Sequence, residues 1–363
     1  MARVLILWNV TEDDVVELWR QDGLAVPWET VDEEMALLAN VLREGGHEPF
    51  IVNIRDDLAV LLDVIAKVKP DAIMNLVEFF RDDIEHEHHV PALFELLDLQ
   101  YTGNRPLALA LCQKKPHAKA LLVAAGIPTP RSLLVEVGGT VPTDLALRFP
   151  LIVKPAYEDA SGGIDAGSVV ADRAALDARV AHVLAEHQMA ALIEEYLDGR
   201  ELHCAILGND PPEPLPLFEM VFSDPTLPRI ITYRAKWDPF SPDYAAVEGK
   251  CPPTDLDEAI VAHVQAVAIR AFHALGCRDY ARVDMRLDPV TGEPYVLEVN
   301  PNPDLADGCA FASSVRASGR TYGQAINEIV GFALARALAR PVRDAGPSDT
   351  LLREYLATRA AKG

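Results

Sequence analysis

Hydrophobic and polar positions give the first part of the chain an alternating texture. In residues 1–108, short apolar runs typical of strands alternate with segments whose apolar residues recur at helical spacing. Such alternation predicts a small parallel sheet covered by helices on both faces. The strands are expected at 4–7, 48–53 and 72–76, and the helices at 32–43, 57–68, 93–97 and 107–125.

Strands predominate after residue 131. They are expected at 133–137, 151–154, 168–171, 191–197, 202–207, 217–222 and 229–236. Helices are expected at 174–186, 256–275 and 322–339, and 341–349 has the composition of a linker to a short terminal helix. A chain of 363 residues is too long for one ordinary core, so two or three domains of α/β type are expected.

The segments 281–287 and 295–300 show the most informative pattern. Charged and apolar residues alternate throughout 281–287 and through the second half of 295–300. The connector 288–294 is rich in residues that favour turns. An antiparallel hairpin symmetric about Thr291 sets Asp284 opposite Glu298. The same register pairs Arg282 with Asn300 and Asp288 with Pro294. One face then carries Arg282, Asp284, Glu298 and Asn300, and the other carries Val283, Met285, Leu297 and Val299.

The opposed carboxylates of Asp284 and Glu298 would destabilise a sheet unless a cation lies between them. Asn300 adds a neutral oxygen, and ligand sets made of oxygen alone suit Mg²⁺ or Mn²⁺ shared with phosphate oxygens. The alternative is that Arg282 and Arg286 neutralise the two acids by ordinary ion pairs. The hairpin by itself does not decide between a metal site and a salt-bridge network.

Composition narrows the classes of partner. A formal net charge of −22 and a pI near 4.8 argue against a nucleic-acid backbone or an anionic membrane as a partner. Any bound nucleotide must then be contacted by a few individually placed Lys and Arg side chains. The five cysteines lack the close spacing of a zinc site or a disulfide framework. The first residues are typical of a strand and not of a signal peptide, and no apolar run approaches a membrane span. We therefore expect a soluble cytoplasmic protein.

Two further segments carry weaker signals. Lys154 ends an apolar strand and is followed by Ser161, Gly162 and Gly163, a loop whose backbone N–H groups could hold a phosphate although it lacks the Walker spacing. The strand 191–197 closes on two glutamates, where a hinge could read a nucleotide base. The alternatives are a flexible loop and an exposed acidic turn, and Lys236, expected on one strand face with Arg234, could be a solvated lysine.

Taken in order, these segments resemble the ATP-grasp superfamily, and within it the D-alanine–D-alanine ligase branch. The resemblance covers about residues 70–335 and includes 101–103, the helix with Lys115 and Lys119, 125–130, 275–277 and 298–301. It implies an ATP-grasp fold preceded by an N-terminal parallel-sheet domain. The implied division is a pre-ATP-grasp domain at 1–108, a central subdomain at 109–193, a C-terminal subdomain at 194–340, and a linker with a short helix at 341–363.

The resemblance also implies roles for individual residues. For ATP, these are Lys115 and Lys154 at the α- and β-phosphates, Ser161, Gly162 and Gly163 in the covering loop, Glu194, Glu195 and Leu197 around adenine, Glu201 at the ribose and Lys236 at the γ-phosphate. For two Mg²⁺ or Mn²⁺ ions, they are Asp284, Glu298 and Asn300. Arg282 would stabilise the anionic intermediate, and Lys236 and Ser161 would assist catalysis.

The implied activity is an ATP-dependent carboxylate–amine ligase that forms an amide or peptide bond through an acylphosphate, releasing ADP and phosphate. Its partners would be small amino-acid-like molecules. The family often forms homodimers, but the sequence shows no decisive interface. The alternatives are a thiol acceptor, a hydroxyl acceptor as in a small-molecule kinase, or a nucleotide-binding regulator without catalysis.

Departures from the family gather where the substrates would bind. The family's Gly-Ser-Ser loop is Asp159-Ala160-Ser161 here, Trp237 replaces a tyrosine, and 301–304 replaces Thr-x-Pro-Gly. The first-domain His-Gly signature is absent from 75–81. We therefore expect a carboxylate–amine pair other than two D-alanines.

The acidic and histidine-rich stretch 82–89 has Val90 where a His-Glu-x-x-His zinc motif needs its second histidine. It is typical of a solvated helix start. Glu78, Arg81 or His89 could still line the substrate pocket, because this stretch falls near the expected interdomain cleft.

Overall fold

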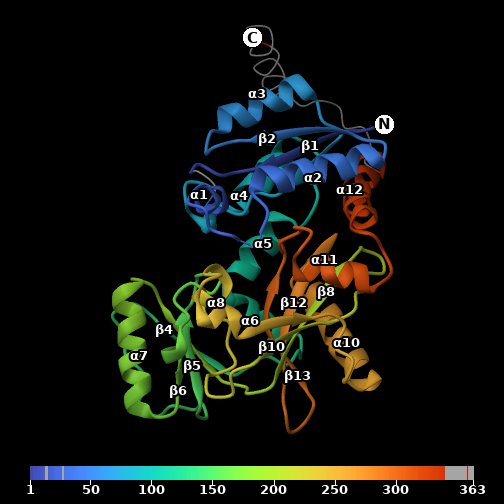
Figure 1. Cartoon of the computed structure of the whole chain (residues 1–363). Coiled ribbons are helices and arrows are strands. Elements are labelled where there is room, and N and C mark those ends of the chain that lie inside the picture. The colour runs from blue at the N-terminus through green and yellow to red at the C-terminus, as the bar shows by residue number, and fades with distance from the viewer. Residues whose placement is uncertain (13–14, 27, 340–357, 359–363) are drawn as a thin grey trace.

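The computed structural model describes residues 1–12, 15–26, 28–339 and 358, and shows three sheets joined around a central pair of helices (Figure 1). The predicted linker and terminal helix at 341–363 lie, apart from residue 358, outside the described residues. No helix in the described ranges is long and apolar enough to cross a bilayer.

The N-terminal sheet is parallel, as predicted, with strand order β2-β1-β3. Its strands are β1 Arg3–Trp8, β2 Glu48–Asn53 and β3 Ala72–Asn75. Helices pack on both faces: α2 Val31–Glu44 and α12 Tyr322–Ala339 on one, α3 Leu58–Val68 and α4 His89–Leu96 on the other. Because α12 comes from the C-terminal end of the fold, the last helix completes the first core (Figure 1). A short helix, α1 Val15–Gln21, was not predicted.

The single helix expected at 107–125 is two helices, α5 Pro106–Gln113 and α6 Lys115–Ala124. Pro116 has no N–H for the carbonyl four residues earlier, so the first helix stops and a second begins beside it.

Next to this helix pair lies an antiparallel sheet of order β4-β7-β5-β6 with α7 Arg173–Glu186 against it (Figure 1). Its strands are β4 Ser132–Val135, β5 Leu151–Pro155, β6 Val169–Val170 and β7 Ala191–Glu195.

The largest sheet has the order β11-β10-β8-β12-β13, with β9 paired to β8. Its strands are β8 Arg200–Leu207, β9 Glu213–Pro214, β10 Phe218–Phe222, β11 Val247–Lys250, β12 Tyr280–Leu287 and β13 Pro294–Asn300. The long helix α10 Glu258–Ala274 covers one face. The other face meets α11 Ala310–Ala317, which, like β9, β11 and the short helix α9 Pro242–Ala245, was not predicted.

The predicted hairpin register is confirmed around the acidic residues and is wrong near the turn. Asp284 opposes Glu298, and Arg282 opposes Asn300. A β-bulge after Asp284 skips one residue of β13, so Leu287 and not Asp288 opposes Pro294. The same bulge puts Val296, and not Leu297, into the apolar core, where Val296 is fully buried.

The strand predicted at 229–236 is also wrong. Residues Tyr233–Trp237 form the helix α8, which begins because the Thr232 hydroxyl accepts the Ala235 N–H at 3.0 Å. The same hydroxyl donates to Asp243 at 2.9 Å, a tertiary contact that the local alternation could not show. In a helix, Arg234 and Lys236 no longer share one face.

A buried carboxylate joins the large sheet to the N-terminal domain. Asp279, which is fully buried, accepts Arg336 of α12 at 2.8 Å, the Gly103 N–H at 3.0 Å and the Asn209 amide at 3.0 Å. Arg336 also donates to the Tyr101 carbonyl at 2.7 Å. The large sheet is thereby held against the N-terminal domain at the edge of the cleft between them.

We expect Asp279→Ala to lower the free energy of unfolding by about 3–5 kcal/mol, because it leaves the Arg336 guanidinium without its buried partner. Urea denaturation followed by circular dichroism measures the change. Asp177→Ala is the matched control: it breaks the exposed pair with Arg173, whose aspartate is 51% exposed, and should cost at most about 0.5 kcal/mol. Equal losses in the two variants would contradict this account.

Candidate active site between the two antiparallel sheets

Polar side chains gather on one face of the large sheet. Alternation along β8, β12 and β13 buries one set of side chains under α10 and turns the other set away from it. Strand pairing sets Glu201 opposite Arg286 and His203 opposite Asp284. The polar set consists of Glu201, His203, Arg282, Asp284, Arg286, Glu298 and Asn300.

The acids of the hairpin contact both an arginine and the amide. Arg282 donates to both oxygens of Asp284 at 2.8 Å, and the Asn300 amide donates to Asp284 at 2.9 Å. Lys115, at the start of α6, lies 3.7 Å from Glu298. The ion-pair alternative is therefore present at Asp284, but Arg286 takes no part in it.

Two carboxylates and one amide fit Mg²⁺ or Mn²⁺ in ligand chemistry, since all three offer oxygen and lie on adjacent strands. The described part of the chain contains no group of three His, Cys, Asp or Glu side chains suited to a metal ion. A divalent ion held by Asp284, Glu298 and Asn300 would therefore need further oxygens from a bound phosphate chain or from water.

A second group of charges is buried in the smaller antiparallel sheet. Glu194 of β7 is 1% exposed and forms ion pairs with Lys154 of β5 at 2.8 Å and with Lys119 of α6 at 2.9 Å. Lys119 also donates to the Thr129 hydroxyl at 2.6 Å, and that hydroxyl donates to the Val296 carbonyl of β13 at 2.8 Å. The two sheets are thus linked through the buried lysine.

Neighbouring charges set the pKa values of this buried group. Burial alone would raise the pKa of Glu194, but the ammonium groups of Lys119 and Lys154 lower it to about 2. Burial would lower the pKa of Lys154, but the carboxylates of Glu194 and Glu298 raise it above its usual value. Glu298 belongs to the other sheet, so the charges of the two sheets influence each other.

The loop after β5 has a backbone conformation that favours glycine. Ser161 and Gly163 have φ of 65° and 68°, and a Cβ at Gly163 would lie 2.6 Å from the His187 ring. Trp237 of α8 donates to the Ala160 carbonyl at 3.1 Å, so the helix that carries Lys236 lies against this loop. The predicted phosphate loop and Lys236 are therefore brought together.

Arginine side chains contact the predicted hinge. The Glu195 carboxylate accepts the Arg148 N–H at 3.0 Å and lies 3.6 Å from Arg131, so arginines of neighbouring loops engage its side chain. The Leu197 carbonyl accepts a hydrogen bond from Arg286 at 3.3 Å. Glu201, the predicted ribose ligand, also contacts Arg286.

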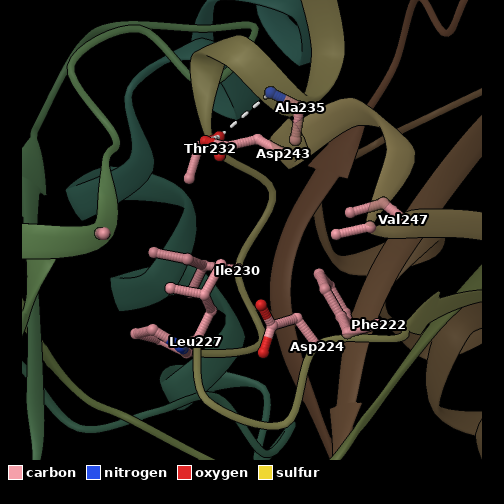
Figure 2. Close-up of a pocket in the computed structure, with 11 residues that line it drawn as sticks. Phe222, Asp224, Leu227, Ile230, Thr232, Ala235, Asp243 and Val247 are labelled. Carbon is pink, nitrogen blue, oxygen red and sulfur yellow. Dashed lines mark hydrogen bonds between the residues drawn. The ribbon is translucent and has the colours of Figure 1, made fainter. Parts of the chain in front are cut away.

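Two pockets border these groups. One lies between α5, the loop after β5 and the hairpin, and is lined by Glu87, Leu109, Cys112, Gln113, Lys115, Asp159, Glu298, Val299, Asn300 and Pro301. The other, mostly apolar, is lined by Ala166, Phe222, Asp224, Leu227, Pro228, Ile230, Thr232, Ala235, Asp243, Ala246 and Val247. In Figure 2, Leu227 and Ile230 line one side of it and Phe222 and Val247 the other.

The segment 78–89 contributes acids to the cleft. Withdrawal from water raises the pKa of Glu87 to about 8, although Asn302 donates to it at 2.9 Å. Glu78 has an exposed side chain, yet partial withdrawal from water and the carboxylates of Asp304 and Asp159 raise its pKa to about 7. Arg81 and His89, the other two candidates here, are exposed. As expected, the stretch 82–89 leads into a helix, α4.

Three residues near this site were not assigned to it from the sequence. Lys119 lies one helical turn beyond Lys115, and only its burial against Glu194 distinguishes the two. His203 lies 3.3 Å from Glu201 and 3.9 Å from Asp284, and the alternation that begins at Glu201 could have revealed it. Arg286 was considered only as a partner for the hairpin acids.

Comparison with known proteins identifies the fold. Residues 122–331 match the family described as D-ala D-ala ligase C-terminus, which is more than half of the chain. The chain belongs to the D-alanine–D-alanine ligase family. The D-alanine–D-alanine ligase of Polaromonas naphthalenivorans is 33% identical over 251 residues, covering 68% of this chain and 73% of that protein. The uncharacterized protein y4sG of Sinorhizobium fredii is 35% identical over 301 residues, covering 81% and 85%.

Solved structures of the same fold agree with this placement. The D-alanine–D-alanine ligase of Bacillus anthracis, complexed with ATP, has a TM-score of 0.69 at 22% identity and covers 93% of this chain and 99% of its own. The VanG D-Ala:D-Ser ligase of Enterococcus faecalis has a TM-score of 0.65 at 19% identity, covering 92% and 99%. The predicted ATP-grasp fold and ligase branch are confirmed.

We expect Glu194→Gln to destabilise the protein by about 3–5 kcal/mol at pH 7, because two buried ammonium groups lose their counter-charge. The carboxylate has a folded-state pKa of about 2 against an ordinary 4.5, so its stabilisation is complete above about pH 4.5. The difference between wild type and variant should therefore shrink as the pH falls toward 2.

Urea titrations between pH 2.5 and 8 measure this difference. Glu186→Gln, at an exposed glutamate on α7 against the same sheet, is the control and should change little at any pH. A Glu194→Gln deficit that stays constant down to pH 2.5 would contradict the assigned pKa.

Proposed function

We propose that this chain joins a small carboxylate to an amine through an acylphosphate, consuming ATP and releasing ADP and phosphate. The family is one of ATP-dependent ligases that form an amide bond. The observation that carries the proposal is that Lys154 of β5 and Lys119 of α6 meet at Glu194, and that Lys119 also reaches β13, the strand of Glu298, through Thr129. The ligase of Bacillus anthracis, which shares this fold, is complexed with ATP.

In this proposal the cations of the site neutralise the triphosphate. Lys119 and Lys154 would meet the inner phosphates, the loop 159–163 would cover them, and Lys236 on α8 would reach the terminal one. Asp284, Glu298 and Asn300 would hold Mg²⁺, whose charge offsets that of the transferred phosphoryl group. Lys115, which contacts Glu298, would lie where the phosphates and the metal meet.

The chemical steps follow from the poor reactivity of a carboxylate. A carboxylate oxygen of the first substrate takes the γ-phosphoryl group, and ADP leaves. The amine nitrogen of the second substrate then attacks the carbonyl carbon, loses a proton, and expels phosphate as the C–O bond breaks. Arg282, held in place by Asp284, is positioned to stabilise the oxyanion formed in that attack.

The acids near the cleft favour a substrate that carries an ammonium group. Burial raises the pKa of Glu78 and Glu87, and repulsion from neighbouring carboxylates, including Asp159, adds to both shifts. An ammonium group would relieve this repulsion. Asp159 and the 301–304 segment are also positions where the chain departs from the family pattern, so the substrate pair is expected to depart with them.

The free thiols of all five cysteines and the need for ATP favour a cytoplasmic location. A homodimer remains a prediction from the family resemblance. Among the alternatives, a thiol or hydroxyl acceptor would keep the nucleotide half of the site, and a regulator would not need Arg282 beside the hairpin acids.

The test is incubation with Mg-ATP and pools of amino acids and small carboxylic acids, following ADP, AMP, phosphate and new masses together. Substrate-dependent ADP and phosphate with a condensed product would establish the ligase. A phosphorylated product would indicate a kinase, and AMP with pyrophosphate would exclude the acylphosphate route.

We expect Asp284→Asn and Glu298→Gln each to lower kcat by at least about 100-fold, since each removes a carboxylate from the proposed metal ligands. EDTA should abolish turnover of the wild type, and added Mg²⁺ should restore it. Coupled ADP release measures both effects. Glu248→Gln, an exposed acid on edge strand β11 of the same sheet, should leave kcat unchanged. Full activity in either hairpin variant would remove these acids from the mechanism.

A further inference from the structure

Arg286 is a buried charge for which the proposed reaction gives no task. It is 3% exposed on β12, two residues beyond Asp284 on the polar face. A buried guanidinium is costly unless carboxylates and carbonyl oxygens accept its hydrogen bonds. Its partners therefore show what the fold uses it for.

All five N–H donors of Arg286 are engaged. Nε and Nη2 donate to one oxygen of Glu201 at 3.1 and 2.6 Å, and Nη2 also donates to the Arg229 carbonyl. Nη1 donates to the carbonyls of Leu197 and Gly199 at 3.3 and 3.2 Å. A lysine, with three donors at a single point, could not replace this planar fork.

Aromatic rings hold the guanidinium in place. Its carbon lies 5.8 Å from the centroid of the Tyr196 ring and 5.5 Å from that of Phe222. Phe222 is also a wall of the apolar pocket in Figure 2, together with Pro228 and Ile230 on either side of Arg229. Arg286 thus joins the hinge, the 227–230 segment and Glu201 at one point.

These contacts keep the Glu201 carboxylate ionised and in one orientation. Burial would raise its pKa, but Arg286 and His203 lower it to about 2. Arg286 holds one carboxylate oxygen, and His203 lies 3.3 Å from the other. A carboxylate with this orientation can accept hydrogen bonds only from groups that reach it along the remaining lone pairs.

We propose that Arg286 is the positioning residue for ribose recognition: by fixing Glu201 and the carbonyls of the 197–199 hinge, it makes the enzyme select nucleotides that carry the ribose hydroxyl that donates to Glu201. The inference rests on the proposed function, because it requires ATP to bind with its ribose at Glu201. A hydroxyl donor is the part of a ribose that an oriented carboxylate can distinguish. A carboxylate that rotates freely would discriminate less between nucleotides with and without that hydroxyl.

The test compares equilibrium binding of Mg-ATP, Mg-2′-deoxyATP and Mg-3′-deoxyATP by calorimetry, which needs no knowledge of the other substrates. Wild type should bind ATP at least about 10-fold more tightly than one of the deoxy forms, as expected for a hydrogen bond to a charged acceptor. In Arg286→Met, a side chain of similar length without donors, this preference should fall below about 3-fold.

Arg200→Met is the matched control. Arg200 precedes Glu201 on β8 but pairs with Glu219 at 2.5 Å and Asp255 at 2.9 Å, so the preference should be unchanged. Once substrates are identified, Arg286→Met should raise KM for ATP about 10-fold or more while KM for the amine changes less than 2-fold. A merely structural role would weaken all ligands together.

The outcomes separate the two claims. If wild type binds no ATP, the proposed function and this inference both fail. If wild type binds ATP without discriminating the deoxy forms, or if Arg286→Met keeps the wild-type preference, the inference alone is overturned. Should Arg286→Met not fold, Glu201→Gln provides the same test, because it removes the charge that Arg286 orients. Retained discrimination in that variant would overturn the proposal as well.

Discussion

The buried carboxylate of Glu194 is the interaction on which the site depends. It binds Lys154 from the neighbouring strand and Lys119 from a helix that packs beneath the other sheet, and Thr129 extends the contact to β13. Glu194 offsets one of the two positive charges, and Glu298 of the large sheet also acts on Lys154. Buried charge needs a counter-charge, so this arrangement favours an anion as the next partner of the two lysines. This charge balance supports the proposed role of the two lysines in binding phosphate.

The same reasoning explains how a chain with a net charge of −22 can accommodate a polyphosphate. Long-range attraction is absent, so each cation must be placed and held by a nearby acid. Arg282 is held by Asp284, Arg286 by Glu201, and Lys154 by Glu194. Pairing by acids also preorganises the cations, since their side chains need not search for a conformation when the ligand arrives.

Sequence reasoning succeeded where local pattern determines structure. Period-two alternation and turn residues were enough to set Asp284 opposite Glu298, and helix and strand order was enough for the parallel N-terminal sheet. Sequence reasoning failed where a contact between residues far apart in the chain determines the structure. Thr232 begins α8 with support from Asp243, and the bulge opposite Met285 moves Val296 into a core shared with α10. Arg286 was associated with the hairpin acids because its true partner, Glu201, lies on a strand 85 residues earlier.

The proposed metal ligands and the proposed substrate contacts lie on different kinds of structure. Asp284, Glu298 and Asn300 lie on paired strands, whose hydrogen bonds fix each side chain relative to the others. The proposed substrate contacts, which include Glu78 and Asn302, lie on connecting segments. Loops accept changes of sequence at small cost to the core, whereas strand positions do not. Solved ligases of this fold are named for D-alanine joined to D-alanine and for D-alanine joined to D-serine, so one scaffold serves different acceptors. A chain that differs from the family at its loops should therefore keep the phosphoryl chemistry and change the molecules that it joins.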